Sequence, residues 1–77
     1  MITIYTDGGS RGNPGNAAIG IVIYQNEKLL LEHKEKLGIT TNNVAEYTAL
    51  IRALTLVQQF NPKEITCYSD SQLLVRQ

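Results

Sequence analysis

Three acidic residues stand where the sequence predicts a strand or a helix to begin or end. Asp7 follows the alternating apolar run 2–6, Asp70 follows the apolar run 64–68, and Glu46 falls near the start of a predicted helix. Hard divalent cations prefer carboxylate oxygens, and clustered carboxylates repel one another without such ions. If the fold brings these residues to one point, they predict a site for two metal ions acting on a phosphodiester.

Each of the three positions also has an ordinary structural explanation. Asp7 precedes two glycines and can begin a turn. Asp70 can cap the N-terminus of a helix that follows it. Glu46 can complete a capping box in which Asn43 is the N-cap residue. These explanations are independent of one another, whereas one metal site accounts for all three acidic residues together.

The first half of the chain predicts three antiparallel strands. Residues 2–6, 17–24 and 29–37 are rich in β-branched or alternating apolar side chains. The glycine-rich segment 7–15 predicts a loop whose backbone can approach a ligand, and a polar turn is expected at 25–28. Such short connections favour a meander, and its polar third strand is expected at the edge of the sheet.

The second half changes to a helical period. A loop at 38–43 leads into a predicted helix over 44–60, which ends at Asn61-Pro62. The apolar stripe of this helix is predicted to contain Glu46, Leu50, Ala53, Val57 and Phe60. A fourth strand is expected at 64–68, and residues 72–77 are predicted to begin a second helix.

A strand, a helix and a following strand form a crossover unit. Such units are right-handed and place the two strands parallel in one sheet. If strand 64–68 lies beside strand 2–6, Asp7 and Asp70 become neighbours at the edge where open α/β sheets bind their ligands. The predicted fold is therefore an α/β fold with a mixed sheet, consisting of an antiparallel three-strand meander and a parallel fourth strand.

Length and composition allow one small domain over residues 1–77. The chain has seven basic and seven acidic residues, so its formal charges balance. If three of the acidic residues bind metal ions, the rest of the surface carries seven basic and four acidic residues. Net charge therefore neither supports nor excludes a polyanionic partner. The single cysteine, Cys67, lies in an apolar run and predicts a buried thiol. Neither a signal peptide nor an apolar stretch long enough to cross a membrane is seen, so we expect a cytoplasmic protein without a membrane partner.

Three motifs in this order and spacing resemble ribonuclease H type 1. They are Tyr-Thr-Asp-Gly-Gly-Ser-Arg-Gly-Asn-Pro-Gly at 5–15, Thr-Asn-Asn-Val-Ala-Glu-Tyr-Thr-Ala-Leu at 41–50 and Tyr-Ser-Asp-Ser-Gln-Leu at 68–73. The resemblance covers the whole chain but only about the N-terminal half of a family domain. It implies a ribonuclease H-like fold and an endonuclease that hydrolyses the RNA strand of RNA–DNA hybrids, leaving a 5′-phosphate and a 3′-hydroxyl.

The resemblance also implies roles for individual residues. Asp7, Glu46 and Asp70 match catalytic carboxylates that hold two Mg²⁺ ions, with Mn²⁺ as an alternative. Thr41 matches a residue of a pocket for a phosphate of the DNA strand. The residues that match contacts to the minor groove and the RNA 2′-hydroxyls are Gly8, Gly9, Ser10, Asn13, Asn42, Asn43 and Gln72. Contacts of this kind read groove shape and the 2′-hydroxyl, so little sequence preference is expected.

Some parts of the family pattern have no match in the chain. The family's fourth carboxylate, its usual mobile histidine, its fifth strand and its later helices would all follow Gln77, which leaves the sheet edge beside strand 64–68 uncovered. Two other functions therefore stay open. One is a non-catalytic nucleic-acid-binding module, or a half-domain that pairs with a second copy or with a complementing C-terminal half. The other is a DNA nuclease or resolvase of the wider superfamily.

Overall fold

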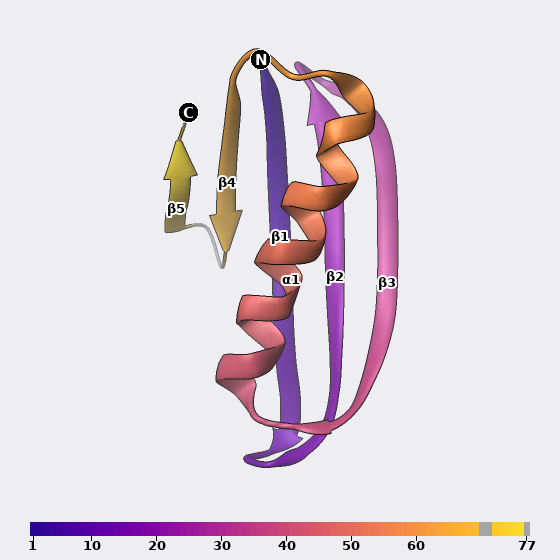
Figure 1. The fold of residues 1–77 in the computed structure, drawn as a ribbon, viewed down its shortest axis with the longest axis vertical. Coiled ribbons are helices and arrows are strands. Elements are labelled where there is room, and N and C mark those ends of the chain that lie inside the picture. The colour runs from indigo at the N-terminus through magenta and orange to yellow at the C-terminus, as the bar shows by residue number, and fades with distance from the viewer. Residues whose placement is uncertain (70–71, 77) are drawn as a thin grey trace.

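The computed structural model describes residues 1–69 and the backbone of residues 72–76, and it consists of one sheet with a single α-helix across one face (Figure 1). The strands lie in the order β3-β2-β1-β4-β5. In chain order the elements are β1 (Ile2–Gly12), β2 (Gly15–Gln25), β3 (Lys28–Thr40), α1 (Asn42–Leu56), the 3-10 helix η1 (Val57–Phe60), β4 (Ile65–Ser69) and β5 (Gln72–Arg76). The predicted mixed sheet with its helical crossover is confirmed.

The antiparallel meander is longer than the sequence predicts. The β1–β2 ladder runs without interruption from Ile2 opposite Gln25 to Gly12 opposite Gly15. The prediction of a loop over residues 7–15 is therefore wrong for residues 7–12, which are strand. Glycine weakens a strand only modestly, and here each residue of the segment is paired with one on β2, so the ladder outweighs local preference.

The parallel pairing of β4 with β1 is confirmed, and it covers only half of β1. The register runs from Ile2 opposite Ile65 to Thr6 opposite Ser69, where β4 ends. Within the described residues, the rest of this edge of β1, from residue 7 onward, therefore has no strand beside it. Figure 1 shows the N-terminal end of α1 lying below the end of β4, next to this part of β1.

The chain after β4 does not form the predicted helix. The backbone of residues 72–76 is strand β5, antiparallel to β4, with Gln72 opposite Ser69 and Arg76 opposite Thr66. A helix of six residues is marginal in isolation, whereas the open edge of β4 offers unpaired backbone groups. A short apolar run is compatible with either structure, so the sequence alone did not distinguish them. The sheet edge expected to be uncovered is thus occupied by β5.

The core lies between α1 and the sheet. The buried positions of the helical segment are Ala45, Ala49, Ala53 and Val57, spaced four residues apart. Ala49, Ala53 and Val57 share one cluster with the buried isoleucines of β1 and β2, namely Ile2, Ile4, Ile19, Ile21 and Ile23, and with Ile65 and Cys67 of β4. Of the predicted apolar stripe, Ala53 and Val57 are buried, and Leu50 and Phe60 pack against the core as partly buried residues. The stripe is wrong at its first position, because Glu46 is exposed and its neighbour Ala45 is buried instead.

A row of tyrosines crosses the opposite face of the sheet. Tyr5 on β1 stands edge-on to Tyr24 on β2, with ring centroids 6.1 Å apart, and stacks on Tyr68 of β4 at 5.6 Å. Tyr5 is 47% exposed, so helix α1 leaves this face uncovered in the described chain. Such aromatic pairs contribute about 0.5–1.5 kcal/mol beyond the area that they bury.

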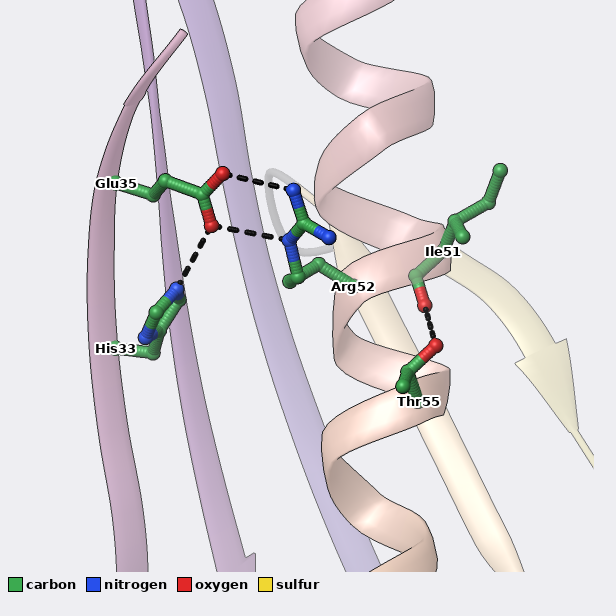
Figure 2. A network of polar contacts seen from close by, with 5 residues as sticks. All are labelled: His33, Glu35, Ile51, Arg52 and Thr55. Carbon is green, nitrogen blue, oxygen red and sulfur yellow. Dashed lines mark hydrogen bonds and ion pairs between the residues drawn. The ribbon is translucent and has the colours of Figure 1, made fainter.

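A polar network joins the edge strand β3 to α1 (Figure 2). Arg52 of α1 donates from Nε and Nη2 to the two carboxylate oxygens of Glu35, at 3.0 and 2.7 Å. The Nε2 atom of His33 lies 3.0 Å from one of these oxygens. The hydrogen bond with His33, followed by that with Arg52, lowers the pKa of the Glu35 carboxyl. The network therefore favours the charged form of Glu35.

Two further predictions concern Cys67 and the membrane. Cys67 is buried, as predicted, and desolvation raises the pKa of its thiol. Among the described residues, neither α1 nor η1 has the length and apolar character that a membrane crossing would need.

Candidate functional site

Asp7 lies inside β1, at the point where β1 loses its second neighbour. It pairs with Gly20 of β2 and follows Thr6, the last residue of β1 that pairs with β4. Buried and exposed residues alternate along β1, with Thr6 buried and both Tyr5 and Asp7 exposed. The side chain of Asp7 therefore leaves the strand on the face that carries the tyrosine row, beside the free edge.

Gly8 brings β1 into contact with the start of α1. A Cβ atom at Gly8 would lie 2.6 Å from the carbonyl oxygen of Ala45 and 2.9 Å from the amide nitrogen of Glu46. No side chain fits into this contact, so glycine is required there for steric reasons rather than for its backbone freedom. Since Asp7 precedes Gly8 in the chain, the contact sets the backbones of Asp7 and Glu46 close together.

Glu46 is exposed in the second turn of α1. The helix begins two residues earlier than the predicted capping box requires, because its N-cap is Thr41, whose hydroxyl oxygen accepts the backbone N–H of Val44 at 3.2 Å. Asn43 is therefore not the N-cap, and the capping-box explanation of Glu46 is wrong. In the part of the chain that the structure describes, the Glu46 carboxylate has no hydrogen bond or ion pair. Its oxygens are available for an ion or a ligand.

Asp70, the third predicted metal ligand, lies outside the described residues. The side chain of Gln72, a predicted substrate contact, is likewise not described. Over residues 1–69 no group of three or more His, Cys, Asp or Glu side chains is close enough to hold a metal ion. The described chain thus supplies two carboxylates of the predicted set, and their oxygen donors suit a hard cation such as Mg²⁺.

Three of the predicted binding residues form one hydrogen-bonded cluster. The side-chain oxygen Oδ1 of Asn42 accepts the backbone N–H of Ser10 at 2.6 Å and lies 3.0 Å from the donating Ser10 hydroxyl. The backbone N–H of Asn42 donates to Oδ1 of Asn13 at 3.2 Å. The Ser10 hydroxyl also contacts the carbonyl oxygen of Gly12. The sequence predicts these residues one by one, and the structure adds that they bond to one another.

The remaining predicted binding residues lie at the same end of the sheet. A Cβ atom at Gly9 would be 3.8 Å from Oδ1 of Asn42, its nearest described neighbour, so Gly9 lies beside the cluster with room to spare. Asn43 is exposed at the second position of α1, and Thr41 caps the helix. The predicted binding residues whose side chains are described therefore gather where β1 meets the N-terminus of α1.

Two lysines share a shallow hollow with Asp7, which the sequence did not indicate. The hollow measures about 480 Å³ and is lined by Asp7, Ala18, Ile19, Gly20, Lys34, Glu35 and Lys36. It exists because Gly20, which pairs with Asp7 on one side and with Lys34 on the other, has no side chain. The pairing register places these residues together, and periodicity alone cannot reveal a register.

Comparison with known sequences identifies one family over the full chain. The family model described as RNase H matches residues 1–77. The chain is similar to ribonuclease HI of Halobacterium salinarum, with 45% identity over 74 residues, which is 95% of this chain and 37% of that protein.

Solved structures show the same arrangement of strands and helix. LC11-RNase H1, crystallised in complex with an RNA/DNA hybrid, is 50% identical and superposes with a TM-score of 0.85, over 92% of this chain and 55% of that one. The N-terminal RNase H domain of the Mycobacterium tuberculosis protein Rv2228c is 42% identical, with a TM-score of 0.85, over 91% and 55% of the two chains. The chain therefore spans about half the length of these solved relatives.

Proposed function

The chain belongs to the ribonuclease H family, and from this premise we propose that it provides the first part of a metal-dependent endonuclease acting on RNA–DNA hybrids. The reaction is hydrolysis of the RNA strand to a 5′-phosphate and a 3′-hydroxyl. One observation carries the proposal, namely the contact of Gly8 with Ala45 and Glu46, which sets two carboxylate-bearing backbones side by side. The hybrid bound to LC11-RNase H1 supports the substrate class.

The proposed metal ligands are Asp7, Glu46 and Asp70. Asp7 and Glu46 are exposed, and the carboxylate of Glu46 has no protein partner among the described residues. Two Mg²⁺ ions are proposed, with Mn²⁺ as a substitute, and when bound they supply Lewis acidity to the scissile phosphodiester. The role of the chain is to hold carboxylate oxygens close together. This arrangement is unfavourable until cations neutralise their charges.

The proposed substrate contacts come from the polar groups around the start of α1. The Thr41 hydroxyl oxygen already accepts the N–H of Val44, so its hydrogen can be donated to a phosphate oxygen of the DNA strand. The N-terminus of a helix also favours an anion through its partial positive charge. Ser10, Asn13, Asn42, Asn43 and Gln72 are proposed to meet 2′-hydroxyls in the minor groove, with the backbone of Gly8 and Gly9.

Because the chain spans about half of the solved relatives, the complete activity is proposed for this chain together with further protein. That protein is a complementing C-terminal half or a second copy of the chain. A second candidate function is binding of the hybrid without hydrolysis. It is favoured by the share of the solved relatives that the chain spans, which is 55% of each.

A cleavage assay on a labelled RNA–DNA hybrid, with the chain as part of the intact gene product, tests both candidates. With Mg²⁺ present, the proposal expects RNA cleavage that Asp7→Asn abolishes. Glu27→Gln is the matched control, since it removes one exposed carboxylate in the turn between β2 and β3. Binding of the hybrid without cleavage would support the second candidate instead. Cleavage that Asp7→Asn leaves unchanged, or cleavage of duplex DNA in preference to the hybrid, would contradict the main proposal.

A further inference from the structure

The amide of Ser10 finds its hydrogen-bond partner on a helix. Within the described residues, no strand lies beside β1 beyond Thr6 on the β4 side. The Ser10 N–H donates to Oδ1 of Asn42 at 2.6 Å, across a separation of 32 residues. A side chain at the start of α1 therefore holds the part of β1 that β4 does not reach.

Asn42 is not needed to begin the helix. Thr41 caps α1 with its own hydroxyl, and Asn42 is the first residue of the helix proper. Two groups of Asn42 turn toward β1 and its hairpin instead, the side-chain oxygen to Ser10 and the backbone N–H to Asn13. The contacts of Asn42 thus join two segments of the chain rather than complete one of them.

This cluster and the Gly8 contact hold α1 to β1 at two neighbouring places. Glu46 follows Asn42 by four positions, one helical turn, so both residues lie on the same side of the helix. On the strand, Asp7 and Gly8 precede Ser10. A shift of the first turn of α1 along β1 would move Glu46 relative to Asp7.

We propose that Asn42 is a positioning residue, whose side-chain oxygen fixes the first turn of α1 on β1 so that Asp7 and Glu46 can share a cation. Its consequence for catalysis rests on the proposed function, whereas its effect on Ser10 and on metal binding does not. Because Oδ1 accepts the N–H of Ser10 and lies 3.0 Å from its hydroxyl oxygen, the amide NH₂ of Asn42 is the group left for a 2′-hydroxyl. One side chain then serves the metal site through its oxygen and the substrate through its nitrogen.

The first measurement is exchange of the Ser10 amide hydrogen with solvent, followed by NMR without metal or nucleic acid. Asn42→Ala removes the acceptor, so exchange at Ser10 should accelerate by about three- to tenfold, the factor expected from one exposed hydrogen bond. Asn42→Asp keeps an acceptor oxygen in the same place and should retain the protection. Asn43→Ala is the matched control, because the adjacent Asn43 makes no hydrogen bond to β1 in the described structure.

The second measurement is the affinity for Mg²⁺ alone, by calorimetry. Asn42→Ala should weaken binding by about three- to tenfold, Ser10→Ala should weaken it less, and Asn43→Ala should leave it unchanged. Unchanged Ser10 exchange in Asn42→Ala, or faster exchange with unchanged Mg²⁺ affinity, would overturn the proposal. An unaltered chain that binds no Mg²⁺ would overturn it together with the metal site. If the Mg²⁺ differences appear but the hybrid is not cleaved, only the proposed function fails.

Discussion

Gly8 of β1 lies so close to Ala45 of α1 that an added methyl group would stand 2.6 Å from the Ala45 carbonyl oxygen. This contact joins two segments that are far apart in the sequence and sets the depth at which the helix rests on the strand. Its neighbour Gly9 differs, because a methyl group there would stand 3.8 Å from Asn42 Oδ1. The two glycines form a natural pair for comparison.

Gly8→Ala should destabilise the fold by about 1–3 kcal/mol, the usual cost of overpacking. The atoms in the way belong to the helix backbone, so α1 itself must move. Gly9→Ala should change the free energy of unfolding by less than about 1 kcal/mol, because it meets no close contact and restricts the unfolded chain. Urea denaturation of both variants measures the difference. Equal effects of the two substitutions would contradict the assigned contact.

Thr41→Ala should cost about 1 kcal/mol of stability, because it removes the side-chain acceptor for the N–H of Val44. Asn43→Ala should cost less than half of that, since Asn43 lies inside the first turn. Thermal unfolding of the two variants decides between the capping residue found in the structure and the one predicted from the sequence. A larger loss for Asn43→Ala would favour the predicted capping box.

Millimolar Mg²⁺ should raise the melting temperature of the unaltered chain. A ligand that binds the folded state stabilises it by mass action, and the cation also relieves repulsion among carboxylates. Asp7→Asn should remove most of this increase while leaving the melting temperature without metal the same or higher. Differential scanning calorimetry with and without Mg²⁺ gives the comparison, and NaCl at the same ionic strength controls for screening. An increase of equal size in Asp7→Asn would argue against Asp7 as a ligand.

Acid should weaken the attachment of β3 to α1. The pKa of Glu35 is lowered in the folded state by His33 and Arg52, so its contribution to stability is present above the unfolded pKa, about 4.3, and is lost as the pH falls through the lower folded pKa. The urea concentration at the midpoint of unfolding should therefore drop more steeply below about pH 4.3 in the unaltered chain than in Glu35→Gln. Glu32→Gln, on the same strand but exposed on the other face, should behave like the unaltered chain.

The order of the strands could be predicted because it depends on short connections and on the handedness of a crossover. The alternation of Ile2 and Ile4 and the apolar run at 64–68 predicted the two strands, and the crossover rule predicted that strand 64–68 joins the sheet as a parallel strand. The full length of β1 could not be predicted, because the glycine-rich residues 7–12 have the composition of a loop and are strand through their pairing with residues 15–20 of β2. The same is true of β5, since a short apolar run becomes a strand or a helix according to what lies beside it.

Residue types in the candidate site could be predicted, but their contacts could not. The carboxylates of Asp7 and Glu46 and the amide of Asn42 offer oxygen and nitrogen atoms for binding ligands, and the sequence indicates this whatever their neighbours are. The bond from Ser10 to Asn42 depends on where β4 ends, and the lysines beside Asp7 depend on the register of two ladders. The capping residue was missed by two positions because Thr41 and Asn43 are both good N-cap residues and only helix packing selects between them.

The tyrosine row gives the protein a built-in optical reporter. The chain contains no tryptophan, so its near-ultraviolet signal comes chiefly from tyrosine. Tyr5 couples to Tyr24 across the hairpin and to Tyr68 across the parallel pair, whereas Tyr47 is exposed on the helix. The near-ultraviolet circular dichroism signal therefore reports the packing of Tyr5 against Tyr68 without an attached label. This contact forms only when the two ends of the chain come together.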